Sequence, residues 1–143
     1  MLSSCLTNSS SIIKERFHKG KFLISSTKAN TSFGASIVEQ YNKIIIQVSR
    51  PFFGNVANIS IDSDGEMQSL SQEEFKFSFQ LSKKDGRKIY LWLKQCLKYK
   101  EFTDKESYIF VDEMKVRMIC SFDADKVYFE IKGREYDLSG YVK

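Results

Sequence analysis

Hydrophobic residues change their spacing within one short stretch, EFKFSFQLSKKDGRKIYLWLKQCL at residues 74–97. At positions 75 to 81, apolar side chains alternate strictly with polar ones, which is the pattern of a half-buried strand. From Ile89 onward, the apolar positions are 89, 92, 93, 96 and 97, which is the spacing of one helix face. The stretch therefore predicts a strand at 74–81 followed by an amphipathic helix over about 83–99.

The same alternation predicts strands elsewhere, at 21–26, 33–39, 43–49, 56–62, 107–112, 114–122, 126–132 and 135–142. Between two of them, DSDGEMQSLSQ reads as a polar connection with a turn at Asp64–Gly65. We expect an α+β fold: mainly an antiparallel sheet of about eight strands, with one amphipathic helix (about 83–99) packed on it. Residues 1–20 are expected to form a loose N-terminal segment, and residues 21–143 a single domain.

Composition agrees with a small globular sheet protein and adds a charge pattern. Aromatic residues make up 14% of the 143 residues, which favours strands. The net charge is only +4. However, residues 82–100 contain seven Lys or Arg and one Asp, whereas residues 51–81 contain one Lys and five acids. This distribution predicts a local basic surface rather than a generally basic protein.

Much of this charge lies on the predicted helix, for which Ser82 is the expected N-cap and Asp85 completes an arrangement close to a capping box. Its basic residues lie outside the apolar stripe, as on a solvated helix surface. Alternatively, an exposed Leu91 among them would suit a partner or a dimer face. The residues of that candidate face are Arg87, Tyr90, Leu91, Lys94 and Lys98.

The polar faces of the strands provide a second candidate surface. Lys and Arg neutralise phosphates, and an exposed aromatic ring stacks on a base of any sequence. Tyr41, Phe52 and Phe53 could add stacking near Lys43 and Arg50, although a core position is equally expected for the two phenylalanines. The predicted nucleic-acid-binding residues are Lys43, Arg50, Lys76, Lys115, Arg117, Lys126, Tyr128 and Lys132.

Nothing in the sequence argues for an enzyme, a cofactor or a metal site. His18, the one histidine, lies in a polar region and is expected to be exposed. Residues 62–66, DSDGE, lack the remaining ligands of a calcium loop and read as a turn. No phosphate-binding glycine motif is present. We therefore expect no catalytic residues, no metal and no cofactor.

The cysteine residues and the hydropathy of the chain indicate in which cellular compartment the protein is expected. Cys96 and Cys120 lie on predicted apolar faces and read as core residues without a disulfide framework. The sequence contains no run of about 18 apolar residues, so no membrane span is predicted. A reducing, intracellular (cytoplasmic) location is the expectation.

Residues 59–97, ISIDSDGEMQSLSQEEFKFSFQLSKKDGRKIYLWLKQCL, give a strand, an acidic turn with D-G-E-M, a polar loop, a strand ending in Leu-Ser, and a helix with a Trp. Over about residues 43–97, this order resembles the positive-cofactor-four family of single-stranded-DNA-binding transcription coactivators. The resemblance implies a curved antiparallel sheet with one helix, dimerisation through the helices, and single-stranded DNA on the concave sheet face. In this chain, SLSQEE replaces the family's basic loop.

Two functions remain open from the sequence. The first is a non-enzymatic protein that binds single-stranded DNA or RNA on a basic, aromatic sheet face. The alternative is a small protein-interaction module or inhibitor, of a kind that viruses or mobile elements encode, which docks on another protein. The expected partner is thus single-stranded nucleic acid or a protein, with a homodimer possible and no membrane.

Overall fold

The computed structural model describes one helix and nine strands, in residues 15–27, 30–52, 54–71, 82–98, 106–111, 115–123, 125–133 and 136–143. Five strands precede the helix and four follow it. In chain order the elements are β1 (Arg16–Ser26), β2 (Asn30–Glu39), β3 (Lys43–Arg50), β4 (Gly54–Asp62), β5 (Met67–Ser71), α2 (Lys83–Cys96), β6 (Glu106–Val111), β7 (Val116–Asp123), β8 (Lys126–Lys132) and β9 (Tyr136–Val142).

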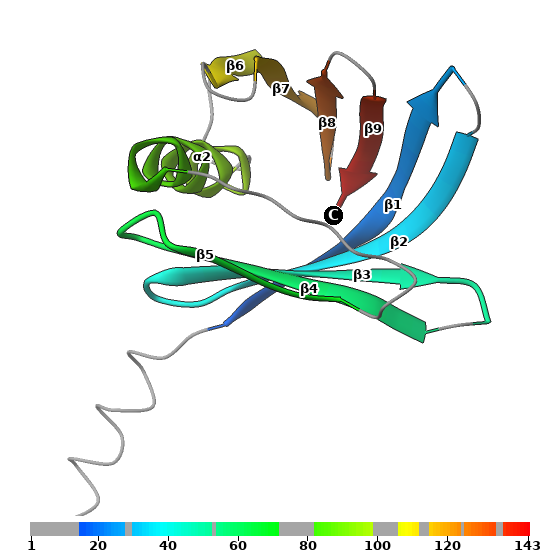
Figure 1. Cartoon of the computed structure of the whole chain (residues 1–143), viewed down its shortest axis with the longest axis horizontal. Helices are drawn as coiled ribbons and strands as arrows, with labels where there is room; N and C mark the ends of the chain where they lie inside the picture. Colours follow the sequence, from blue (N-terminus) through cyan, green and yellow to red (C-terminus); the bar gives the residue numbers. More distant parts are fainter. Residues whose placement is uncertain are drawn as a thin grey trace, which may run out of the picture.

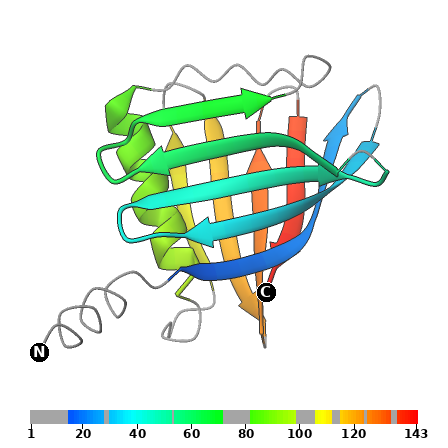
Figure 2. The ribbon, with the colours of Figure 1, turned by 90° about the horizontal axis from the view of Figure 1, so that it is seen from below.

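All nine strands belong to one antiparallel sheet with the order β5-β4-β3-β2-β1-β9-β8-β7-β6. Strand β1 joins the two halves, because it pairs with β2 on one side and with β9 on the other. The sheet curves so that β1–β5 and β6–β9 face each other, and α2 lies at the open side between β6 and β4 (Figures 1 and 2). The predicted α+β class, mainly antiparallel sheet with one packed helix, is confirmed.

The core lies between the two halves of the sheet and α2. Phe129 on β8 is central: the Trp92 ring of α2 meets it edge-on at a centroid distance of 5.7 Å, and the Phe22 ring of β1 lies 6.2 Å away. Ile44 and Val127 are completely buried in the same cluster. The concave side of the sheet is thus filled by the protein's own side chains. A nucleic acid would have to bind another part of the described surface.

Helix α2 follows the predicted apolar stripe. Ile89, Trp92, Leu93 and Cys96 are buried, and the Ser82 side chain accepts a hydrogen bond from the Asp85 backbone N–H at 3.2 Å, as expected for an N-cap. The helix ends at Cys96, three residues before the predicted boundary.

Two glycines explain how the β4–β5 turn packs on the first turns of α2. Gly65 has φ +91°, a conformation that disfavours residues with a Cβ. A Cβ built on Gly86 would lie closer than 3.0 Å to the Gly65 carbonyl, and a Cβ on Gly65 would be equally close to the Lys83 carbonyl and the Arg87 nitrogen. Gly86 therefore permits a backbone-to-backbone contact, which offsets its poor helix propensity.

Replacing Gly86 by Ala should destabilise the protein, although alanine is the better helix former by about 1 kcal/mol. The added methyl group would overpack a rigid backbone contact, at a cost of about 1–3 kcal/mol. Urea unfolding of G86A and of K84A, an exposed position in the same turn, measures the difference. A G86A variant as stable as the wild type, or more so, would show that the contact is absent.

The strands differ from the prediction at several places. Strand β1 begins at Arg16, so residues 16–20 belong to the sheet and not to a loose segment. Strand β5 lies within the expected polar connection, because Met67 packs on the core although its neighbours are polar. Strand β7 begins at Val116, and Lys115 is a turn residue with φ 52°. The predicted strand at 74–81 lies outside the described residues.

Candidate nucleic-acid interface

Strands β6–β9 carry a row of aromatic and basic side chains on the side of the sheet opposite the core. In β8, Val127 and Phe129 are buried, so the residues that alternate with them face outward. The strand register continues this side across β7, β9 and β6. We call this surface the outer face; its aromatic and basic members are Tyr108, Phe110, Arg117, Lys126, Tyr128, Lys132 and Tyr141.

Aromatic rings on the outer face are open to solvent. Tyr108 is 66% exposed, Phe110 48% and Tyr128 38%. Tyr128 and Tyr141 are register partners on β8 and β9, and their ring centroids lie 6.1 Å apart. These side chains leave much of their apolar area exposed in the monomer, and this favours a contact with a ligand.

Cations lie directly beside these rings. The Lys126 ammonium is 4.7 Å from the Tyr141 centroid, and the Arg117 guanidinium is 5.7 Å from that of Tyr108. Lys21 on β1 pairs in register with Tyr141 and extends the row. Tyr108 and Tyr141 therefore each have a positive charge within a few ångströms of the ring, which is the combination that a stacked base and its phosphate require.

Acidic residues interrupt the basic character of this surface. Asp123 is the register partner of Lys126, and Asp137 that of Lys132. Glu130 lies between the two lysines along β8. The outer face is therefore mixed in charge, and binding of phosphates would depend on the placement of individual cations rather than on a broad positive field.

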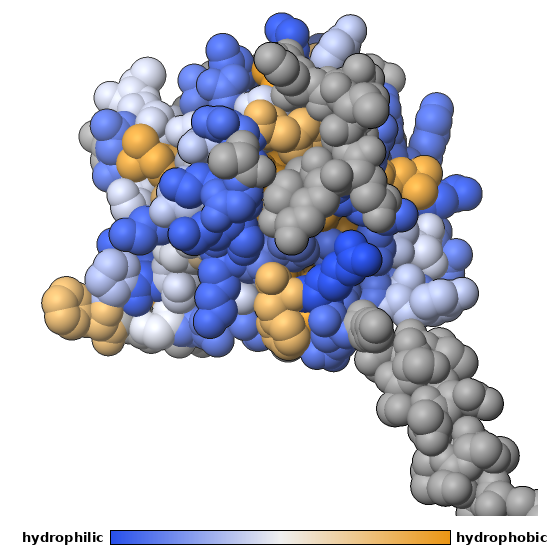
Figure 3. Space-filling view, turned by 180° about the vertical axis from the view of Figure 1, so that it is seen from behind, coloured by the Kyte–Doolittle hydropathy of each residue, from blue (hydrophilic) through white to orange (hydrophobic). Residues whose placement is uncertain are grey.

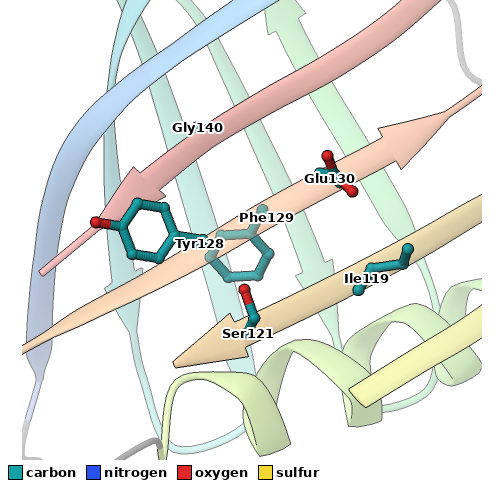
Figure 4. Close-up of a pocket in the computed structure, with 6 residues that line it drawn as sticks. All are labelled: Ile119, Ser121, Tyr128, Phe129, Glu130 and Gly140. Carbon is teal, nitrogen blue, oxygen red and sulfur yellow. The ribbon is translucent and has the colours of Figure 1, made fainter. Parts of the chain in front are cut away.

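A depression of about 280 Å³ opens on this face among Ile119, Ser121, Tyr128 and Glu130, with Phe129 and Gly140 also lining it. Tyr128 is the register partner of Ser121, and Glu130 that of Ile119, so the four side chains form a square over two strands. Figure 4 shows Tyr128 at one end of the depression and Glu130 at the other. The depression thus has an aromatic and an aliphatic side chain in its wall, together with the Ser121 hydroxyl and the Glu130 carboxylate as hydrogen-bonding groups.

The structure brings together half of the predicted nucleic-acid residues. Arg117, Lys126, Tyr128 and Lys132 share the outer face. Lys43 and Arg50 lie at the two ends of β3, which β2 and β1 separate from β9. The remaining two are Lys115, in the turn before β7, and Lys76, outside the described residues.

The aromatic residues expected near β3 are exposed but scattered. Tyr41 is 82% exposed before β3, and Phe52 is completely exposed after it, with φ 71°. The core interpretation of Phe52 is therefore wrong, whereas Phe53 lies outside the described residues. Because Tyr41 and Phe52 flank opposite ends of β3, they do not form one stacking surface.

The candidate partner face on α2 is smaller than predicted. Tyr90 is only 6% exposed and belongs to the core, and Lys94 donates a hydrogen bond to the Gln40 carbonyl at 2.9 Å. Both residues face the sheet, so the expectation that they line an exposed face is wrong. Arg87, Leu91 and Lys98 remain on the solvent side, with Leu91 65% exposed.

His18 is buried, contrary to the expectation of an exposed side chain. Its Nε2 lies 2.9 Å from Glu39 Oε1, and the other carboxylate oxygen of Glu39 lies 3.6 Å from Lys94 Nζ. This cluster links β1, β2 and α2. Burial raises the pKa of the Glu39 carboxyl, but the hydrogen bond with His18 and the charges of Lys94, His18 and Arg16 outweigh it, so the pKa is lowered overall. Burial, and then Glu39 and Asp62, raise the pKa of Tyr90.

Because the pKa of Glu39 is lower in the folded protein, its ionised form stabilises the fold above the ordinary glutamate pKa of about 4.3. This contribution should be lost as the pH falls through the lowered pKa. Near neutral pH, E39Q should lose about 1.5–3 kcal/mol of unfolding free energy, and it should be less sensitive to acid than the wild type. Urea unfolding from about pH 6 to pH 3 measures both effects.

E15Q is the matched control, because Glu15 is exposed and accepts a hydrogen bond from Gln40. If E39Q and the wild type lost stability in parallel on acidification, the cluster would not hold the carboxylate ionised.

The two core cysteines form a disulfide, which the sequence spacing did not predict. Cys96 of α2 and Cys120 of β7 are both completely buried, as expected, and their sulfur atoms are bonded at 2.14 Å. The expectation of free core thiols is wrong. Such bridges are rare in the cytosol, so this one argues against a strongly reducing compartment.

Figure 3 shows one face on which hydrophilic residues predominate and apolar residues appear in separate groups. Among the described residues, no cluster of three metal-ligating side chains occurs, and no helix is long and apolar enough to cross a membrane. In the turn at residues 62–66, Asp62 Oδ1 accepts hydrogen bonds from the backbone N–H groups of Asp64 and Glu66, so these groups are paired within the turn.

Comparisons with models of protein families and with curated proteins gave no match. The resemblance over residues 43–97 therefore stays a prediction, and the function has to be argued from the outer face itself.

Proposed function

We propose that this protein binds single-stranded nucleic acid on the outer face of β6–β9, without catalysing a reaction. The observation that carries the proposal is the pairing of aromatic rings with cations on this face: the exposed Tyr108 with Arg117, and the half-buried Tyr141 with Lys126. Stacking on an aromatic ring holds a base irrespective of its identity, and the adjacent cation attracts the phosphate. Antiparallel strands fix these side chains at regular spacing, so a flexible strand could bind several of them in succession.

The binding surface differs from the one that the resemblance implies. The concave side is filled by the core around Phe129, whereas the outer face is solvated. We therefore propose the same class of ligand on the opposite side of the sheet, with contacts from β6–β9 rather than from the loop that follows the acidic turn.

Fluorescence anisotropy of a labelled single strand of about 25 nucleotides, titrated with protein at low and moderate salt, tests the proposal. We expect micromolar or tighter binding at low salt that weakens steeply as salt is added, because phosphate contacts release counterions. Duplex DNA of the same sequence is the control, since its bases are not free to stack. An absence of binding at low salt would refute the proposal.

A cytoplasmic location belongs to the proposal because single-stranded nucleic acid is available there. The disulfide is compatible with it only if burial protects the bond, since thiol–disulfide exchange requires access of an attacking thiolate. Both Cys96 and Cys120 are completely buried.

The second candidate function is a protein-interaction module or inhibitor, and it is favoured by the exposure of Leu91 on α2. An exposed leucine between basic residues suits a protein contact, including one with a second copy of the chain. If no oligonucleotide binds, affinity capture with wild-type protein and with an L91D variant is the next experiment.

A further inference from the structure

The depression on the outer face contains a carboxylate, which a surface that bound only phosphates would exclude. Glu130 lines the depression together with Ser121, Tyr128 and Ile119. A negative charge at this point repels a phosphate, but it accepts hydrogen bonds from an amino group. The depression is therefore suited to the base of a nucleotide rather than to its backbone.

The size and lining of the depression fit a single planar ring. Its volume of about 280 Å³ is just below the roughly 300–1,000 Å³ of pockets that hold drug-sized ligands. Tyr128 supplies an aromatic wall, and Ile119 an apolar one on the neighbouring strand (Figure 4). A base held between them would present its edge to the carboxylate of Glu130 and the hydroxyl of Ser121.

We infer that Glu130 selects bases that carry an exocyclic amino group, such as cytosine, over thymine or uracil; this inference rests on the proposed function. Cytosine presents its N4 amino group as a donor, and carboxylates accept hydrogen bonds from it. At the position of that amino group, thymine presents its O4 carbonyl oxygen, which a carboxylate repels. In single strands this edge of the base is free for such contacts.

The chain provides a matched control for the charge of Glu130. Asp137 lies on the same outer face, as the register partner of Lys132, but it does not line the depression. E130Q and D137N each remove one negative charge from the outer face. Both should strengthen binding to all strands to a similar extent through the general electrostatic term. Only E130Q should change the selectivity between bases.

The experiment compares the affinities of oligo(dC) and oligo(dT), each of about 15 nucleotides, for the wild type, E130Q and D137N by fluorescence anisotropy. We expect the wild type to prefer oligo(dC) by about fivefold or more, and we expect D137N to keep this ratio. In E130Q the ratio of the oligo(dC) affinity to the oligo(dT) affinity should fall to near one. A glutamine amide can donate a hydrogen bond to the thymine carbonyl as well as accept one from the cytosine amino group.

The possible failures can be told apart. If the wild type binds both strands equally, or if E130Q keeps the preference, Glu130 does not select the base, while the nucleic-acid interface itself still stands. If neither strand binds to any of the three proteins, the proposed function fails, and the inference fails with it.

Discussion

Reduction of the Cys96–Cys120 disulfide is expected to lower the free energy of unfolding by about 3.5 kcal/mol, from the entropy of the loop that it closes. The bridge joins residues 24 positions apart and ties α2 to β7 inside the core. Without it the unfolded chain gains conformational freedom, whereas the two buried thiols still fit an apolar interior. Because small domains are stable by only about 5–15 kcal/mol, this loss would be a large fraction of the total.

Urea unfolding with and without a thiol reductant measures the effect, and a C96A/C120A variant, which should not respond to reductant, is the control. A thiol count on unfolded, unreduced protein provides an independent check. The chain has three cysteines, so one reactive thiol is expected if the bridge is formed. Three reactive thiols would show that the cysteines are free.

Loss of the two exposed tyrosines of the outer face should have the largest effect on binding. Stacking of a base on one aromatic ring contributes about 1–3 kcal/mol, so Y108A and Y128A should each weaken single-strand binding by about fivefold to a hundredfold. Both side chains are partly exposed and contact their neighbours on the sheet, so their removal should lower the free energy of unfolding by no more than about 1 kcal/mol. Anisotropy titrations and urea unfolding of the same preparations separate the two effects.

Y41A is the matched control, because Tyr41 is more exposed than either residue but lies beyond β2 from the outer face. The interface would be misplaced if Y41A weakened binding as much as Y128A did.

The sequence was sufficient to predict those strands that bury only one of their two faces. In β8, Val127 and Phe129 alternate with polar residues because one side of the strand faces the core, so the alternation predicted both the strand and the outward position of Tyr128. Strand β5 was missed because only Met67 among its first residues packs on the core. Its pairing with β4 depends on backbone hydrogen bonds, which the pattern of polar and apolar side chains does not reveal.

Long-range partners were the part that the sequence did not reveal. His18 is buried because Glu39 lies beside it on the next strand, 21 residues later, and spacing alone does not give that register. The same holds for Cys96 and Cys120. By contrast, Tyr108 and Phe110 could have been predicted as outer-face residues, since they alternate with Ile109 and Val111 in a strand that was correctly located.

Photo-crosslinking shows directly where the single strand lies on the protein. A single strand carrying 5-iodocytosine is irradiated in complex with the protein, and the attached residue is identified by peptide mass spectrometry. We predict attachment at Tyr108, Tyr128 or Tyr141 of the outer face. Attachment at Tyr41 or Phe52 instead, both largely exposed in the other half of the molecule, would contradict the proposed interface.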